Sequence, residues 1–97
     1  MIRRDGDSLF LEGALTLGTV SELAAAVEEQ LRQGARVVDF RGVTEVDSAA
    51  LALALEWLRQ AAESKSKTGL RYANLPVAMQ NLAKLYGVSE LLQPASG

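Results

Sequence analysis

Apolar and polar positions follow two periodicities along the chain, and the change from one to the other predicts strands and helices in alternation. Asp5-Gly6 is a favoured pair for a tight hairpin turn and lies between Ile2 and the run Leu9–Leu11. Two short strands are therefore predicted around this turn. Further along, ARVVDF (residues 35–40) is a short, β-branched, nearly continuous apolar run, which indicates a strand covered on both faces. LRYA (residues 70–73) alternates and predicts another strand.

Helical spacing governs the segments between these strands. The first helix is predicted within residues 18–34, because Thr19 and Glu22 fit a capping box and Gly34 lies where a left-handed residue ends a helix. Its expected buried stripe is Val20, Leu23, Ala24, Val27 and Leu31. The second helix is predicted from about Ser48 to Glu63. Its expected buried stripe is Leu51, Ala54, Leu55, Leu58 and Ala62.

A third helix is predicted after a polar connector, SKSKTG, at residues 64–69. Pro76 lies near its first position and Gly87 follows its end, the asymmetry typical of helices. Its expected core face is Met79, Leu82, Ala83 and Tyr86. The remaining residues 88–97 predict a short strand or turn and a frayed end.

The element order is thus β-β-α-β-α-β-α, which predicts an α/β fold with a mixed sheet of four to five strands and about three helices. Residues 1–97 are expected to form one domain, since a chain of this length builds one core. In such sheets, interaction sites gather where strands end and helices begin. The junction DFRGVTEVDS, residues 39–48, is a segment of this kind.

Composition narrows the function. Apolar residues make up 48% of the chain and charged residues 23%, as in soluble globular proteins. The net charge is −2 and the basic residues are scattered, so no nucleic-acid partner is expected. The chain has no cysteine and no histidine, which excludes thiolate and Ser-His-Asp catalysis and histidine metal sites. We expect no metal and no cofactor.

The longest apolar run, Ala49–Leu55, is far shorter than the ~20 residues that a membrane-spanning helix needs. The first ten residues lack the apolar core of a signal peptide. A cytoplasmic protein without direct membrane insertion is therefore expected.

Ser48 is the most informative polar residue at the junction. At the N-cap its hydroxyl would accept a hydrogen bond from a free backbone amide, and Asp47 would place negative charge at the positive helix end. This structural interpretation needs no function. A functional one is compatible with it, because a fixed, solvent-facing hydroxyl beside free amides suits a docking contact or a phosphorylation site.

Other residues have two interpretations each. Trp57 is expected to lie off the buried stripe, as a partly exposed interface anchor or as cover for a sheet edge. Asp39 is expected to be partly buried at its strand end and bonded to loop amides. Glu45 and Asp47 are neighbouring carboxylates, but no metal or acid–base site follows without further convergent ligands.

The segment VVDFRGVTEVDSAALALAL (residues 37–55) resembles the signature of the STAS domain family, in which a strand and a short loop lead to Asp-Ser/Thr-small-Gly-Leu at a helix start. The family includes bacterial anti-anti-sigma factors and the cytoplasmic STAS domains of anion transporters. Within it, the chain is similar to the small stand-alone STAS subunits of Mla phospholipid ABC transporters. The length of 97 residues, VDSAALALAL (residues 46–55) and NLAKLYGV (residues 81–88) carry this likeness.

The resemblance implies a non-catalytic cytoplasmic subunit that binds and supports the ATPase subunit of an ABC transporter. That transporter moves phospholipid for outer-membrane lipid asymmetry, and the complex holds the subunit at the cytoplasmic face of the inner membrane. Ser48 matches the contact position of Mla-type subunits and the hydroxyl that a partner kinase phosphorylates in anti-anti-sigma relatives. The implied contact comprises the loop and helix start Thr44, Glu45, Asp47, Ala49, Ala50 and Leu51, with Trp57 and the outer face of the third helix around Lys84 as further candidates.

The chain departs from the family pattern at Ala50, where Gly is usual, and the added methyl leaves less room at the first helical turn. Three hypotheses remain open at this point. The first is the ATPase-binding subunit, the second an anti-anti-sigma switch phosphorylated on Ser48, and the third a small enzyme. The third has the least support, because no nucleophile–base pair, metal set or phosphate loop is found.

Overall fold

The computed structural model describes residues 2–63 and 69–92. Its elements are β1 Ile2–Asp5, β2 Ser8–Leu15, α1 Val20–Arg32, β3 Val37–Val46, α2 Ser48–Glu63, β4 Arg71–Ala73, α3 Val77–Leu85 and α4 Ser89–Leu92. This order confirms the predicted α/β fold up to α3. Helix α4 is an addition, since a strand or turn was expected there. The predicted connector, apart from Gly69, and the predicted frayed end from residue 93 lie outside the described residues.

The sheet has four strands in the order β1-β2-β3-β4. Strands β1 and β2 pair antiparallel, which confirms the predicted hairpin, but the pair Asp5–Ser8 makes Gly6 and Asp7 the turn residues rather than Asp5 and Gly6. Gly6 adopts a φ of 60° in this turn, which a residue without a side chain does at little cost. The other two pairs, β2·β3 and β3·β4, are parallel. The mixed sheet is therefore confirmed with four strands.

Strand β3 is two residues longer than β2 and accommodates them by two shifts in register. One shift falls between Phe10 and Glu12 of β2, because Phe10 pairs with Asp39 and Glu12 pairs with Gly42 of β3. A Cβ atom at Gly42 would lie 2.9 Å from the Leu11 carbonyl oxygen, so the two backbones come too close for any side chain. This close approach lets β3 follow β2 as far as Val46, where the site begins.

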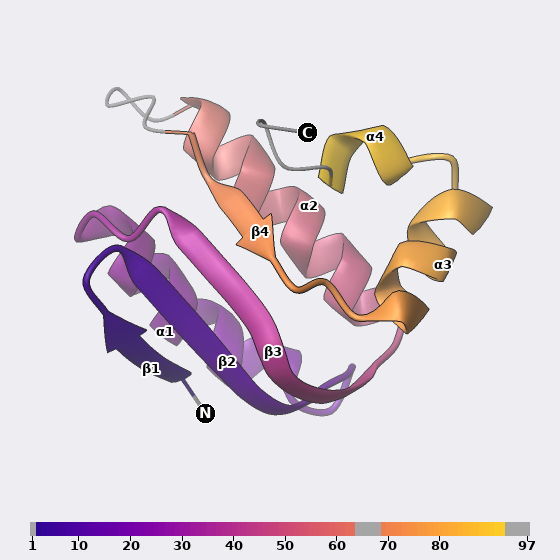
Figure 1. The fold of residues 1–97 in the computed structure, drawn as a ribbon, viewed down its shortest axis with the longest axis horizontal. Coiled ribbons are helices and arrows are strands. Elements are labelled where there is room, and N and C mark those ends of the chain that lie inside the picture. The colour runs from indigo at the N-terminus through magenta and orange to yellow at the C-terminus, as the bar shows by residue number, and fades with distance from the viewer. Residues whose placement is uncertain (1, 64–68, 93–97) are drawn as a thin grey trace.

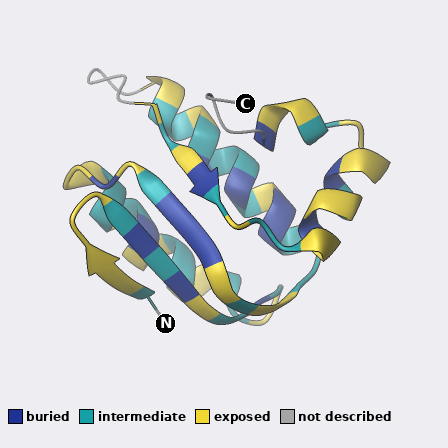
Figure 2. Ribbon diagram, viewed as in Figure 1, coloured by how far each residue is buried: buried dark blue, intermediate teal, exposed yellow. Residues whose placement is uncertain are grey.

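Helices α1 and α2 cover one face of the sheet, and α3 and α4 lie beside the β4 edge against α2 (Figure 1). The buried core lies between the sheet and these helices. The exposed residues are mainly on β1 and on the outer sides of α3 and α4 (Figure 2). The largest fully buried side chains are Trp57, Phe40, Leu9, Leu11, Leu15, Met79, Val27 and Val38. At the β4 edge, the Tyr72 hydroxyl donates a hydrogen bond of 2.6 Å to the Ala54 carbonyl and so ties β4 to α2.

Glycine ends two helices, as predicted. After α3, the amide of Gly87 donates to the Lys84 carbonyl and the amide of Val88 donates to the Ala83 carbonyl at 2.8 Å. This is the Schellman arrangement, and it requires the left-handed φ of 73° that Gly87 adopts. The same pair of bonds closes α1, where Gly34 has a φ of 108°.

The predicted capping box at the start of α1 is wrong. The Thr19 hydroxyl makes no hydrogen bond to the amides of α1. Instead it accepts a bond of 2.9 Å from the Thr16 amide and lies 3.0 Å from the Ala14 carbonyl. It therefore shapes the loop between β2 and α1 rather than the helix start.

The predicted exposure of Trp57 is also wrong, because this side chain is completely buried. The buried residues of α2 are Ala50, Leu51, Ala54 and Trp57, so the core face is rotated by about one position from the expected stripe. Leu55 and Leu58 are only half-buried. Every residue from Ala49 to Leu55 is apolar, and the pattern therefore left the direction of the core undetermined.

Candidate partner-docking site

Asp47, not Ser48, caps helix α2. Its Oδ1 accepts a hydrogen bond of 2.9 Å from the Ala49 amide, and its backbone carbonyl accepts one of 3.0 Å from the Ala50 amide. The expected N-cap role of Ser48 is therefore wrong, and the amides of the first turn at Ala49 and Ala50 are engaged rather than free. A carboxylate at this position also complements the positive end of the helix.

The same carboxylate joins two loops that are distant in sequence. Its Oδ2 accepts a hydrogen bond of 3.0 Å from the Leu17 amide, in the loop between β2 and α1. Both loops follow the carboxyl ends of parallel strands, β2 and β3, which meet at one edge of the sheet. Asp47 thus holds Leu17 next to the start of α2.

Ser48 is the first residue of α2 and is exposed. Because Asp47 provides the cap, the Ser48 hydroxyl has no bond to the helix and points elsewhere. Its Oγ lies 3.3 Å from the Oη of Tyr86, and either hydroxyl is able to donate. The Ser48 hydroxyl is therefore accessible to a partner, and its neighbour Tyr86 holds it in place.

Tyr86 is another residue whose predicted position is wrong. It was expected to pack in the core, but 56% of it is exposed. It is the C-cap of α3, one position beyond the last helical residue, and the left-handed Gly87 follows it. The helical spacing that predicted burial does not apply beyond the last turn of the helix. Because Gly87 marks the helix end, the residue before it, Tyr86, no longer follows the core face.

Exposed residues of the β2–α1 loop, the end of β3 and the end of α3 lie near the start of α2. Together with Ser48 we call them the Ser48 surface, which comprises Leu17, Thr44, Glu45, Ser48 and Tyr86. Thr44 and Glu45 are exposed at the end of β3, and Leu17 is 78% exposed. A tyrosine and a leucine around two hydroxyls have the mixture of apolar area and hydrogen-bonding groups found in protein interfaces.

Four residues of the expected contact do not belong to this surface, and one of them is Asp47, the half-buried cap of α2. Ala50 and Leu51 are buried, with 0% and 3% of their area exposed, and Ala49 is half-buried. The methyl group that distinguishes Ala50 from the usual glycine therefore faces the core. It takes no room from a partner at the surface.

Asp39 is buried, as predicted, but its expected place at a strand end is wrong, because the strand predicted over residues 35–40 continues as β3 to Val46. Only 5% of Asp39 is exposed, and its Oδ1 accepts a bond of 2.8 Å from the Arg41 amide. The Asn74 amide group donates to both carboxylate oxygens at 3.0 and 3.1 Å. These bonds join the inner part of β3 to Asn74, directly after β4, and Asp39 therefore connects two strands rather than shaping a loop.

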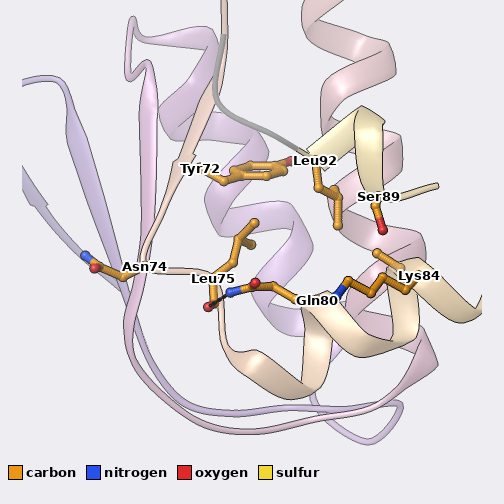
Figure 3. A pocket seen from close by; sticks show the side chains of 8 residues that line it. Tyr72, Asn74, Leu75, Gln80, Lys84, Ser89 and Leu92 are labelled. Atoms are coloured by element: carbon orange, nitrogen blue, oxygen red, sulfur yellow. Dashed lines mark hydrogen bonds between the residues drawn. The ribbon is translucent and has the colours of Figure 1, made fainter. Parts of the chain in front are cut away.

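Lys84 lies on α3 but does not contact Ser48. It lines a hollow on the other side of the helix, next to Gln80 and Ser89 (Figure 3). Trp57, the other outlying candidate, is buried in the core and contributes no surface.

Residues 2–63 and 69–92 contain no cluster of three or more metal-ligating side chains. Within the same ranges, no helix is both long and apolar enough to cross a bilayer.

Comparison with known proteins gives one family. The model described as "Mlab, STAS domain" matches residues 1–93. Among solved structures, one titled "Crystal Structure Analysis of Mglu" is similar over 78% of this chain, with 26% sequence identity and a TM-score of 0.50. The similar region is 19% of that chain, so it concerns a small part of a longer protein. No protein with a curated description matches the sequence.

Proposed function

Since this chain belongs to the STAS domain family, in the group described as Mlab, we propose that it is a non-catalytic subunit that binds and supports the ATPase subunit of an ABC transporter. The transporter moves phospholipid for outer-membrane lipid asymmetry. The subunit is cytoplasmic and is held at the inner membrane through the complex.

The observation that carries this proposal is the accessible Ser48 hydroxyl beside the exposed Tyr86. Asp47 fixes the helix start and the Leu17 loop, so the Ser48 surface is preorganised and loses little conformational freedom on binding. Tyrosine is enriched among residues that dominate interface energies. Leu17, with 78% of its area exposed, adds apolar area that a partner would cover.

The chemistry of the surface supports a binding role. Its polar groups are the three hydroxyls of Thr44, Ser48 and Tyr86 and the Glu45 carboxylate, and the sequence contains no histidine or cysteine to activate a nucleophile. A protein partner needs only complementary shape and hydrogen bonds from these groups.

The test is a calorimetric titration of the transporter ATPase with wild-type protein and two variants. Ser48→Glu places a bulky charge within the contact, and we expect it to weaken binding about tenfold or more. Ser21→Glu makes the same change at an exposed position of α1 and serves as the matched control, with unchanged affinity. Equal affinities for all three proteins would refute docking through Ser48, provided that their melting curves agree.

The exposed hydroxyl also favours a second candidate, an anti-anti-sigma switch phosphorylated on Ser48. A kinase could reach Ser48, because its hydroxyl is outside the capping bonds of α2. However, Asp47 occupies the Ala49 and Ala50 amides that would otherwise bind a phosphate. Intact-mass analysis of the protein from its native cells should show a phosphorylated fraction on Ser48 if this function holds. A Ser48 that is unmodified under all growth conditions would eliminate it.

A further inference from the structure

A second concave area lies between the end of β4 and the helices α3 and α4, away from Ser48. It is a half-open hollow of about 500 Å³. Its wall includes Tyr72, Leu75, Gln80, Lys84, Ser89 and Leu92 (Figure 3). This volume falls within the range of about 300–1,000 Å³ that small-molecule sites occupy.

One polar atom in the wall has no partner. The Oγ of Ser89 is buried, and no described residue forms a hydrogen bond with it. Leaving a buried hydroxyl unsatisfied costs about 1–3 kcal/mol, so such groups are rare in folded proteins and call for an explanation. A ligand group in the hollow would provide the missing partner.

Lys84 provides the only formal charge in the wall of the hollow as described. Within residues 2–63 and 69–92, its ammonium group forms no salt bridge. Its side chain extends along α3 towards Gln80, at the rim of the hollow (Figure 3). A single unpaired cation beside an unsatisfied hydroxyl suits a ligand with one negative charge.

The rest of the wall combines the apolar surface of Tyr72, Leu75, Ala83 and Leu92 with the polar side chains of Asn74 and Gln80. The Gln80 amide group donates a bond of 2.8 Å to the Leu75 carbonyl, which joins α3 to the end of β4. The Tyr72 hydroxyl is bonded to the Ala54 carbonyl, and burial raises the pKa of Tyr72 above its usual range. Its ring, together with Leu75 and Leu92, therefore forms a preformed apolar wall.

We propose that this hollow binds a small carboxylate with an apolar tail. The carboxylate pairs with the Lys84 ammonium and accepts a hydrogen bond from the Ser89 hydroxyl. The tail lies against Tyr72, Leu75 and Leu92. One cation and one hydroxyl match the single charge of a carboxylate better than the double charge of a phosphate monoester.

The test uses octanoate as the probe and the isolated chain, so its outcome does not depend on binding to an ATPase. Saturable amide shifts of Ala83 and Ser89 in NMR titrations are expected. Acetate, which lacks the tail, and octanol, which lacks the charge, should each bind at least tenfold more weakly. Binding of octanol as tight as that of octanoate, tighter binding of octyl phosphate, or no saturable shift would overturn the proposal.

Two variants assign the contacts. Lys84→Met should weaken octanoate binding about tenfold, whereas Arg36→Met removes an exposed charge at the opposite end of the sheet region and should change nothing. Ser89→Ala should weaken binding severalfold without lowering the melting temperature, because the hydroxyl has no partner within the described structure to lose. Unchanged octanoate affinity in both Lys84→Met and Ser89→Ala would refute the assignment.

Discussion

Two adjacent residues at the start of α2 have different surroundings, and we propose different roles for them. The Asp47 carboxylate accepts bonds from the Ala49 and Leu17 amides, and Ser48 is thereby free to face solvent beside Tyr86. The motif Asp-Ser therefore provides a cap followed by an exposed hydroxyl, which we propose as the docking contact.

This division predicts different costs for two alanine substitutions. Asp47→Ala removes the cap and the link to Leu17, and it should lower the free energy of unfolding by about 1–2 kcal/mol. Ser48→Ala removes an exposed hydroxyl outside the cap and should change stability by less than about 0.5 kcal/mol. Urea unfolding of both variants is the measurement. A loss in Ser48→Ala as large as that in Asp47→Ala would show that Ser48 caps the helix.

At the scale of elements, the sequence was most informative where a backbone conformation demands a particular residue. Gly34 and Gly87 predicted helix ends correctly, and Asp5-Gly6 predicted the hairpin, because left-handed backbone favours glycine whatever surrounds it. The orientation of α2 was not predictable, since the apolar run Ala49–Leu55 offers several possible core faces. Packing against the sheet selects the face that buries Trp57.

The residues of the Ser48 surface were likewise predictable only where a local pattern specified them. Ser48 and its exposed neighbours Thr44 and Glu45 were predicted from the strand–loop–helix junction and the family motif. Tyr86 was missed because it is distant in sequence and was assigned to a helical face that ends one residue earlier. Its contact with Ser48 depends on how α3 packs against α2, which no local pattern specifies.

Gly87 is expected to connect stability with docking. Gly87→Ala strains a left-handed residue and should cost about 1–2 kcal/mol, as should Gly34→Ala at the end of α1. Only Gly87→Ala should also weaken ATPase binding, because it disturbs the turn that presents Tyr86. Chemical denaturation and calorimetric titration of both variants are the measurements. Equal affinities in the two variants would mean that this turn has no part in docking.

At the scale of the whole molecule, helix α3 separates two surfaces. Tyr86, the C-cap of α3, belongs to the Ser48 surface, which lies near the carboxyl ends of β2 and β3. Lys84 of the same helix lines the hollow beside β4. Tyr72 is buried in the core, and its hydroxyl joins the edge strand β4 to α2. Stability therefore depends on Tyr72, whereas the proposed docking depends on Tyr86.

The buried Tyr72 predicts a loss of stability in alkali. Burial raises the pKa of Tyr72 in the folded chain, whereas the unfolded chain releases this proton near pH 10. This stabilisation is therefore complete below pH 10 and decreases as the pH rises above it, by up to about 1.4 kcal/mol per pH unit. Tyr72→Phe should be less stable at pH 8 by about 1 kcal/mol, through loss of the bond to Ala54, but should depend less on pH above 10. Urea unfolding between pH 8 and 11.5 measures both, and parallel curves would contradict the role of Tyr72.

The central claim is that the Ser48 surface docks onto a transporter ATPase, and methyl NMR of the complex tests it most directly. Leu17 and Leu91 are both exposed, at 78% and 60%, but Leu91 lies near Leu55 and Leu58, about 10–15 Å along α2 from Ser48. We predict that saturating the ATPase attenuates the methyl signals of Leu17 and Thr44 and leaves those of Leu91 unchanged. Attenuation of Leu91 with Leu17 and Thr44 unaffected would place the partner on another face and contradict the account.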